Sequence, residues 1–291
     1  MPLSDEKNEL MKLEASKRSK EYHTHTSRCN HATGDVEDYC AAAVERGIDV
    51  LGISDHTPLP DDRWLFRRMK YEHLGEYLSA IDRAAARYPT LCVLKSMECD
   101  YLNEYSDFYR DELLGKYSLQ YLIGAVHWFK TNTGWVEVPD GKCEKEHLIR
   151  YTEQYLAALE NRDFLFMAHP DIFGSFYPKW DSETESCSRA ILRAARDLKV
   201  VLEINSHGLR KSRIQTDKGT WTKYPILPFW ELAAEYGITV VINSDAHRPD
   251  HIGLGADDCY GIAARLGLNL ADFSFLESNR VENQPPIQTA N

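Results

Sequence analysis

The sequence has few of the features that direct a chain to a membrane, to the cell exterior or to nucleic acid. No apolar run approaches the roughly 20 residues that a membrane-spanning helix needs. The N-terminal segment, MPLSDEKNELMKLEASKRSKE, is charged throughout and has no apolar centre, so it is not a signal peptide. Basic residues are outnumbered, with 34 Lys and Arg against 45 Asp and Glu, which gives a net charge of −11. This balance argues against nonspecific binding to phosphate backbones.

Paired cysteines are also missing, because the seven cysteines are scattered, odd in number and form no CxxC motif. Their pattern argues against a disulfide framework and a cysteine-based zinc site, and it is typical of a reduced, intracellular protein. We therefore expect a cytoplasmic protein with no membrane partner and no nucleic-acid partner. No coiled-coil pattern or clear apolar patch indicates its oligomeric state.

Seven short apolar segments alternate with amphipathic helical patterns. The expected strands lie near 20–24, 48–54, 91–98, 120–126, 163–168, 199–204 and 238–243, and the expected helices near 35–46, 71–87, 107–116, 144–160, 184–197 and 226–236. Without a break that resembles a linker, this order predicts an α/β fold, a distorted (β/α)7 TIM-like barrel. A doubly wound open sheet is the alternative. We expect a polar extension at 1–18, one barrel domain at 19–280 and a loose tail at 281–291.

Helix 35–46 has clear end signals. Asp35 is a cap residue, Asp38 stands three positions later, and Gly47 occupies the position after the last turn.

Side chains that can bind a metal follow almost every predicted strand. Because the carboxyl ends of parallel strands meet at one face of a barrel, we expect these side chains to converge. Burying so many titratable groups without a cation would be costly. The predicted metal ligands are His23, His25, His31, His56, Glu98, His127, His169, Asp245 and His247. The sixth strand ends in Glu203 and Asn205, whereas His73, His147, His207 and His251 are not expected to bind metal.

These nine groups exceed what one tetrahedral zinc ion can use, so they predict two or three divalent ions. Nitrogen and oxygen ligands suit zinc, iron or manganese. Clustered divalent ions are a recurring solution for phosphoester hydrolysis. Phosphate also favours arginine, and the basic candidates in strand-end loops are Arg28, Arg210, Lys211 and Arg248, with Arg210 preferred.

The motifs together resemble the PHP (polymerase and histidinol phosphatase) superfamily. The HTH opening, SDH, HPD and SDAH occur in that family's order. The segment HTHTSRCNHATGDVEDYCAAAVERGIDVLGISDHTPLP resembles the start of the monofunctional histidinol-phosphate phosphatases, and MECDYL, YLIGAVHW and LEINSHGLRK match later blocks of that branch. The resemblance covers about residues 20–268. Two departures are Glu21, where the family usually has aspartate, and Lys95, near a turn where glycine is common.

This resemblance implies a trinuclear site that hydrolyses L-histidinol phosphate to L-histidinol and phosphate. Carried onto this chain, it implies one ion held by His23, His25, Glu98 and Asp245, a second by Glu98, His127 and His169, and a third by His31, His56 and His247. Glu98 would bridge the first two ions.

We expect a hydroxide that bridges the first two ions to attack phosphorus in line, with Arg210 stabilising the charge on the phosphoryl oxygens. Asp55 or a metal-bound water would protonate the leaving alkoxide. The amine and imidazole of the substrate would lie in the loop after the third strand, against Tyr101, Glu104 and Phe108.

Two alternatives stay open. One is a PHP phosphoesterase that acts on nucleotides or nucleic-acid ends, which the net charge and the lack of a basic groove disfavour. The other is a noncatalytic metal-binding barrel, which the complete ligand set disfavours.

Overall fold

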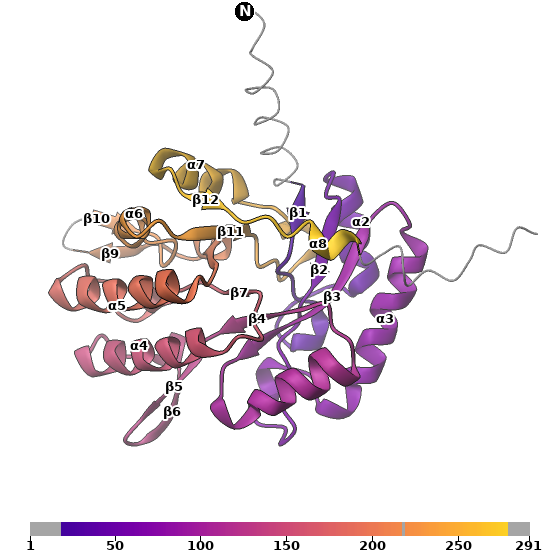
Figure 1. Ribbon diagram of the computed structural model, residues 1–291, viewed down its shortest axis with the longest axis horizontal. Coiled ribbons are helices and arrows are strands. Elements are labelled where there is room, and N and C mark those ends of the chain that lie inside the picture. Colours follow the sequence, from indigo (N-terminus) through magenta and orange to yellow (C-terminus); the bar gives the residue numbers. More distant parts are fainter. Residues whose placement is uncertain (1–18, 217–218, 279–291) are drawn as a thin grey trace, which may run out of the picture.

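Eight parallel strands form the centre of the computed structural model, which describes residues 19–216 and 219–278 (Figure 1). The strands run in the order β1-β2-β3-β4-β7-β8-β11-β12. Their bounds are β1 Lys20–Glu21, β2 Val50–Ile53, β3 Cys92–Asp100, β4 Tyr121–Ala125, β7 Phe166–Met167, β8 Leu202–Asn205, β11 Thr239–Asn243 and β12 Asn269–Leu270. The expected extension at 1–18 and tail at 281–291 lie outside the described residues.

The sheet curls so that β1 returns to β11. Thr24, just after β1, forms a parallel bridge with Ala246, and the His25 amide donates to the Ala246 carbonyl at 2.8 Å. Closer to the strand starts, the Glu21 carboxylate accepts from the Ser244 amide at 3.0 Å. The fold is therefore the predicted distorted TIM-like barrel, with β12 as a short addition beside β11.

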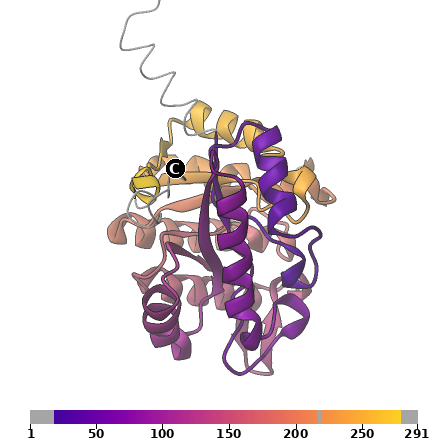
Figure 2. The same cartoon turned by 90° about the vertical axis from the view of Figure 1, so that its right-hand side faces the viewer.

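Helices cover the outer side of the strands. They are α2 Val36–Glu45, α3 Leu74–Arg87, α4 Lys145–Glu160, α5 Ser182–Leu198, α6 Leu227–Glu235, α7 Ala256–Leu266 and α8 Phe275–Ser278. Figure 2 shows α2 and α3 outside the first strands, whereas α4 and α5 lie side by side on the opposite side in Figure 1. Two antiparallel hairpins, β5 Trp128–Thr131 with β6 Gly134–Glu137 and β9 Ile214–Thr216 with β10 Gly219–Trp221, were not anticipated.

The helix signals at 35–46 are confirmed in α2, where Asp35 and Asp38 form a reciprocal capping box and Gly47 has a φ of 69°. The segment expected as a helix at 107–116 is a π-helix, Phe108–Lys116. Its buried Phe108 and Leu113 are five positions apart, which suits the wider turn of a π-helix.

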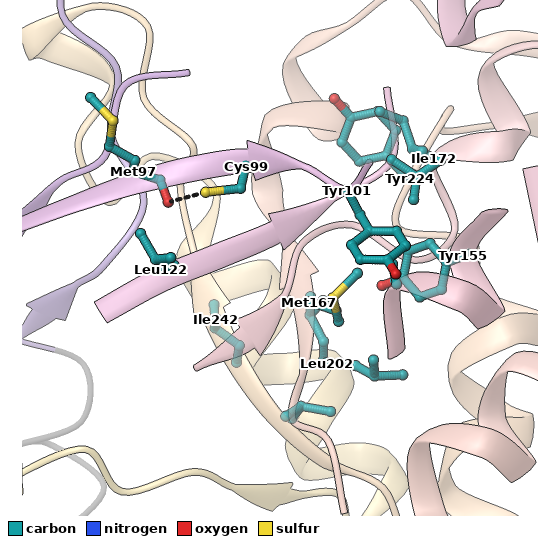
Figure 3. Close-up of a cluster of buried hydrophobic side chains, with 14 of the residues drawn as sticks. Met97, Cys99, Tyr101, Leu122, Tyr155, Met167, Ile172, Leu202, Tyr224 and Ile242 are labelled. Carbon is teal, nitrogen blue, oxygen red and sulfur yellow. Dashed lines mark hydrogen bonds between the residues drawn. The ribbon is translucent and has the colours of Figure 1, made fainter. Parts of the chain in front are cut away.

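Alternation along the strands separates two apolar layers. One layer faces outward and packs with helix residues, and its strand members are Met97, Leu122, Met167, Leu202 and Ile242. Figure 3 shows Tyr155 of α4 in the same cluster.

The neighbouring positions face the barrel interior, where Leu94, Ile123, Phe166 and Val241 form a separate cluster. Continuing at every second residue, β3 reaches Glu98 and the register of β4 reaches His127. The interior is thus apolar at the strand starts and polar at the strand ends.

Candidate metal centre

A cavity of about 270 Å³ opens at the carboxyl ends of the strands. The structure brings the nine predicted metal ligands together in and under this cavity. Seven of them line it: His31, His56, Glu98, His127, His169, Asp245 and His247. His23 and His25 lie beneath, with no exposed surface.

One set of donor atoms surrounds a common point below the cavity. His23 Nε2 and His25 Nε2 are 3.0 Å apart, and Asp245 Oδ1 lies 3.2 Å from His25 Nε2 and 3.7 Å from His23 Nε2. Glu98 Oε2 is 3.4 Å and 3.3 Å from the same two nitrogens. Two ligands about 2.1 Å from a tetrahedral zinc ion lie roughly 3.4 Å from each other, so these spacings suit one ion.

The other oxygen of Glu98 faces a second set. Glu98 Oε1 lies 3.0 Å from His169 Nε2 and 3.6 Å from His127 Nε2, and the two imidazole nitrogens are 3.1 Å apart. One carboxylate therefore contacts two donor sets with its two oxygens, which is the geometry of a bridging ligand.

A third set lies at the mouth of the cavity. His31 Nε2 and His247 Nε2 are 3.0 Å apart, and the His31 and His56 rings stack with centroids 5.2 Å apart. His56 also approaches the first set, because its Nδ1 is 3.0 Å from Glu98 Oε2. Donor atoms of His25, His56 and His247 lie within 4.8 Å of one another.

Hydrogen bonds from the far side of the rings fix which nitrogens face inward. His23 Nδ1 donates to Glu203 Oε1 at 2.8 Å, and His127 Nδ1 donates to Asp100 Oδ1 at 3.0 Å. Each ring then points its Nε2 toward the cluster, as metal-binding histidines commonly do. Sequence reasoning placed Glu203 at a strand end but did not identify it or Asp100 as a partner of a ligand.

The Nε2 lone pairs of His31 and His247 form a site that favours a cation. His31 Nδ1 donates to the Cys29 carbonyl at 2.7 Å and His247 Nδ1 to the Asp245 carbonyl at 3.1 Å, so two Nε2 lone pairs face each other 3.0 Å apart. Asp245 Oδ1, which is buried, has no hydrogen-bond partner. A divalent ion would remove the repulsion and satisfy the oxygen, so the residues present fit a metal cluster.

Electrostatics in the cluster point the same way. Although burial favours the neutral form, the neighbouring His127, His23 and His56 hold the pKa of Glu98 well below its usual value. Burial also opposes a charge on His25, yet the nearby carboxylates of Asp245 and Glu98 raise its pKa to about 9. Burial and the neighbouring imidazoles instead lower the pKa values of His31, His56 and His247, so these three rings favour the neutral form that binds a metal.

The backbone is strained at two of these positions. His169 has a φ of 28° and Asp245 a φ of 47°, values that residues other than glycine seldom adopt. Strain of this kind is concentrated at functional sites, where the surrounding structure maintains it. Here the strained residues are two that aim their side chains into the cluster.

The rest of the cavity wall comes from residues that sequence reasoning largely missed. Lys211 was predicted and does line the cavity. The other wall residues are Arg67, Arg68, Asp100, Trp128, Glu137, Pro139, Ile172, His207 and Tyr224. The basic and aromatic segment RWLFRR, which follows the second strand, was the available signal for two of them.

The other three basic residues expected to contact substrate do not line the cavity. The Arg210 guanidinium donates to the backbone carbonyls of Ser244 at 2.6 Å and Leu254 at 2.8 Å, so it ties two loops together. Arg28 pairs with acidic side chains outside the barrel mouth, and Arg248 pairs with its neighbour Asp250 at the surface.

The expected proton donor and the expected pocket for the amine and imidazole are also placed elsewhere. Asp55 is fully buried and accepts from the Thr26 amide and hydroxyl, both at 2.9 Å, instead of facing the cavity. Glu104 forms an ion pair with Arg63 at 2.7 Å.

The two aromatic residues expected beside Glu104 belong to the core instead. Tyr101 lies edge-on to Phe164, and Phe108 packs against Tyr71. The loop after β3 turns toward the helices because its aromatic residues complete the apolar layer there.

Comparisons with known proteins give the family of the chain. The PHP domain family matches residues 21–207. A Deinococcus radiodurans protein named "Probable histidinol-phosphatase" is 30% identical over 243 residues, which cover 79% of this chain and 87% of that protein.

Two solved structures share the fold. A Listeria monocytogenes protein assigned as a histidinol phosphatase has a TM-score of 0.68 at 24% identity, covering 82% of this chain and 99% of its own. Histidinol phosphate phosphatase from Lactococcus lactis, complexed with zinc, L-histidinol and phosphate, has a TM-score of 0.66 at 16% identity, covering 86% and 94%. Within residues 19–216 and 219–278, no helix is long and apolar enough to cross a membrane. By its family match and by its identity with the Deinococcus protein, the chain belongs to the PHP domain family.

Proposed function

We propose that the protein is a metal-dependent phosphomonoesterase that hydrolyses L-histidinol phosphate to L-histidinol and phosphate. The observation that supports this most is the set of facing imidazole nitrogens and carboxylate oxygens in and under the cavity, which suits a multinuclear metal site. The name of the Deinococcus relative and the ligands of the Lactococcus structure indicate the substrate.

Three divalent ions, of zinc, iron or manganese, would occupy the three donor sets. His23, His25, Glu98 and Asp245 would hold the first, Glu98, His127 and His169 the second, and His31, His56 and His247 the third. Bound ions of this kind supply a hydroxide near neutral pH that can attack phosphorus in line, and they neutralise the phosphoryl oxygens.

The residues of this chain would position the phosphomonoester over the cluster. Lys211 and Arg67 are the basic side chains of the cavity wall with solvent access, and they would pair with phosphoryl oxygens that the ions do not contact. Arg68 is buried and its guanidinium is held 2.6 Å from Asp100, so its role would be to keep Asp100 against His127.

Phosphate release in the presence of each of the three metals tests the proposal. We expect hydrolysis of histidinol phosphate at least tenfold faster, as kcat/KM, than hydrolysis of a nucleoside monophosphate or of a phosphate at an oligonucleotide end. His23→Ala should abolish activity and lower the metal content. The matched control is His73→Ala, because His73 is exposed and lies in none of the donor sets. Metal-replete protein without activity on any phosphomonoester would refute the function, and an active His23→Ala variant with full metal content would refute the site.

A further inference from the structure

We propose that the ion pair between Arg67 and Glu137 is the element that recognises a zwitterionic phosphomonoester, with Glu137 as the specificity residue for the ammonium group. This inference rests on the proposed function and names a recognition residue for it. Arg67 Nε and Glu137 Oε1 are 2.6 Å apart, and both side chains line the cavity that contains the proposed metal ligands.

Glu137 stands next to the metal cluster although it lies on a separate hairpin. It is the last residue of β6 and pairs in register with Trp128, the first residue of β5. Val138 then donates its amide to the His127 carbonyl at 2.7 Å. One end of this hairpin is thus tied to a proposed metal ligand, and the Glu137 carboxylate is held at the edge of the site.

Other carboxylates of the cavity wall are already engaged. Glu98 and Asp245 face the proposed ions, and Asp100 uses both oxygens, one for His127 and the other for Arg68. Glu137 has a side chain that is 12% exposed, and Arg67 is the partner that the structure gives it. It is therefore the cavity carboxylate that a substrate cation can reach.

The pair can exchange partners without leaving a charge unpaired. Histidinol phosphate carries an anionic phosphate and a cationic amine on adjacent parts of one small molecule. Arg67, whose side chain is 35% exposed, can turn its guanidinium to the phosphate while Glu137 takes the ammonium. Each protein charge then keeps an opposite charge beside it, so the desolvation penalty of an isolated ion does not arise.

An aromatic wall adjoins this pair and suits the flat, apolar part of the substrate. Trp128 lines the cavity, and the Trp64 ring stacks parallel to it with centroids 4.2 Å apart and an interplanar angle of 2°. Trp135 meets Trp64 edge-on at 5.7 Å. Stacked indoles form a rigid surface on which an imidazole can lie, beside the carboxylate that would bind the amine.

Kinetics with two substrates test the proposal. The change is Glu137→Gln, and the substrates are histidinol phosphate and p-nitrophenyl phosphate, which has no cationic group. Because a hydrogen bond to a charged group contributes about 1.5–3 kcal/mol, we expect kcat/KM for histidinol phosphate to fall about 10- to 100-fold. The fall for p-nitrophenyl phosphate should be less than threefold. Product inhibition gives a second measurement on the Glu137→Gln variant. Its inhibition constant for L-histidinol should be at least tenfold higher than that of wild type, and its inhibition constant for inorganic phosphate should stay within threefold.

Glu104→Gln is the matched control, because Glu104 also pairs with an arginine but does not line the cavity. It should change neither substrate by more than twofold. Equal losses of kcat/KM on both substrates, as a folding defect of Glu137→Gln would also produce, would overturn the role of Glu137 but not the proposed function. The absence of a loss on either substrate would do the same. A wild-type protein that cleaves neither substrate would overturn the proposed function, and the inference with it.

Discussion

Replacing Glu203 with glutamine would remove one acceptor oxygen from a carboxylate that is fully buried. Its Oε1 accepts from His23 Nδ1 at 2.8 Å and from Asn243 Nδ2 at 2.9 Å. Its Oε2 accepts from Asn205 Nδ2 at 2.8 Å and from the His169 amide at 3.2 Å. An amide nitrogen cannot accept a hydrogen bond, so in either orientation of the new side chain two of these four donors lose their acceptor.

Each buried donor without a partner costs about 1–3 kcal/mol, so the free energy of unfolding should fall by about 4 kcal/mol in total. For a domain of this size that corresponds to a decrease in Tm of roughly 8–16 °C. Where the amide nitrogen faces His23, the ring must move its proton to Nε2, which then cannot bind a metal. We therefore also expect metal affinity to fall about 10- to 100-fold.

Calorimetry of metal-depleted protein would measure the loss of stability separately from the loss of metal, and a competition titration with zinc would measure affinity. Glu45→Gln is the control, because Glu45 is an exposed residue of α2. A Glu203→Gln variant with a Tm within 1 °C of wild type and an unchanged zinc affinity would show that Glu203 neither supports the site nor orients His23.

Three further predictions concern packing, capping and thiol access. In Gly52→Ala, the new Cβ would lie 1.8 Å from the Tyr121 hydroxyl oxygen, so Tm should drop by several degrees. Gly75→Ala is the control, because its new Cβ would meet nothing within 4 Å, and its Tm should be equal or higher. Asp181→Ala removes the capping box of α5 and should cost about 1 kcal/mol in chemical denaturation; an unchanged midpoint would contradict that. Iodoacetamide should alkylate Cys143 first, since the other six thiols are buried, and mass spectrometry that found another site modified first would disprove it.

Much of the barrel could be predicted because its strands are buried on both faces. Each of the seven apolar segments contains or overlaps a strand of the sheet, and the helices between them have clear apolar faces. β12 has only two residues, and the strands of the two hairpins have three or four. β1 and β7 are equally short, but each lies within a longer segment of the predicted alternation of strands and helices, whereas β12 and the hairpin strands lie outside the predicted elements.

The cavity wall was harder to predict because long-range pairing decides which basic side chains stay available. Arg210 follows a strand end, as the proposed ligands do, but nearby backbone carbonyls take up its guanidinium. Arg67 and Glu137 are 70 positions apart and meet only because the β5–β6 hairpin reaches the loop after β2. The spacing of residues along the sequence cannot predict contacts between segments this far apart.

The sequence by itself determined the order of the strands and the imidazoles and carboxylates at their ends, because alternation and strand polarity follow from local chain geometry. Only the tertiary structure decided which donor atoms face one another, which carboxylates support the ligands from behind, and which charged pair stands at the cavity edge. Those outcomes depend on contacts between loops that are far apart in the sequence. The free energy of these contacts depends on the arrangement of the whole fold and not on any one segment.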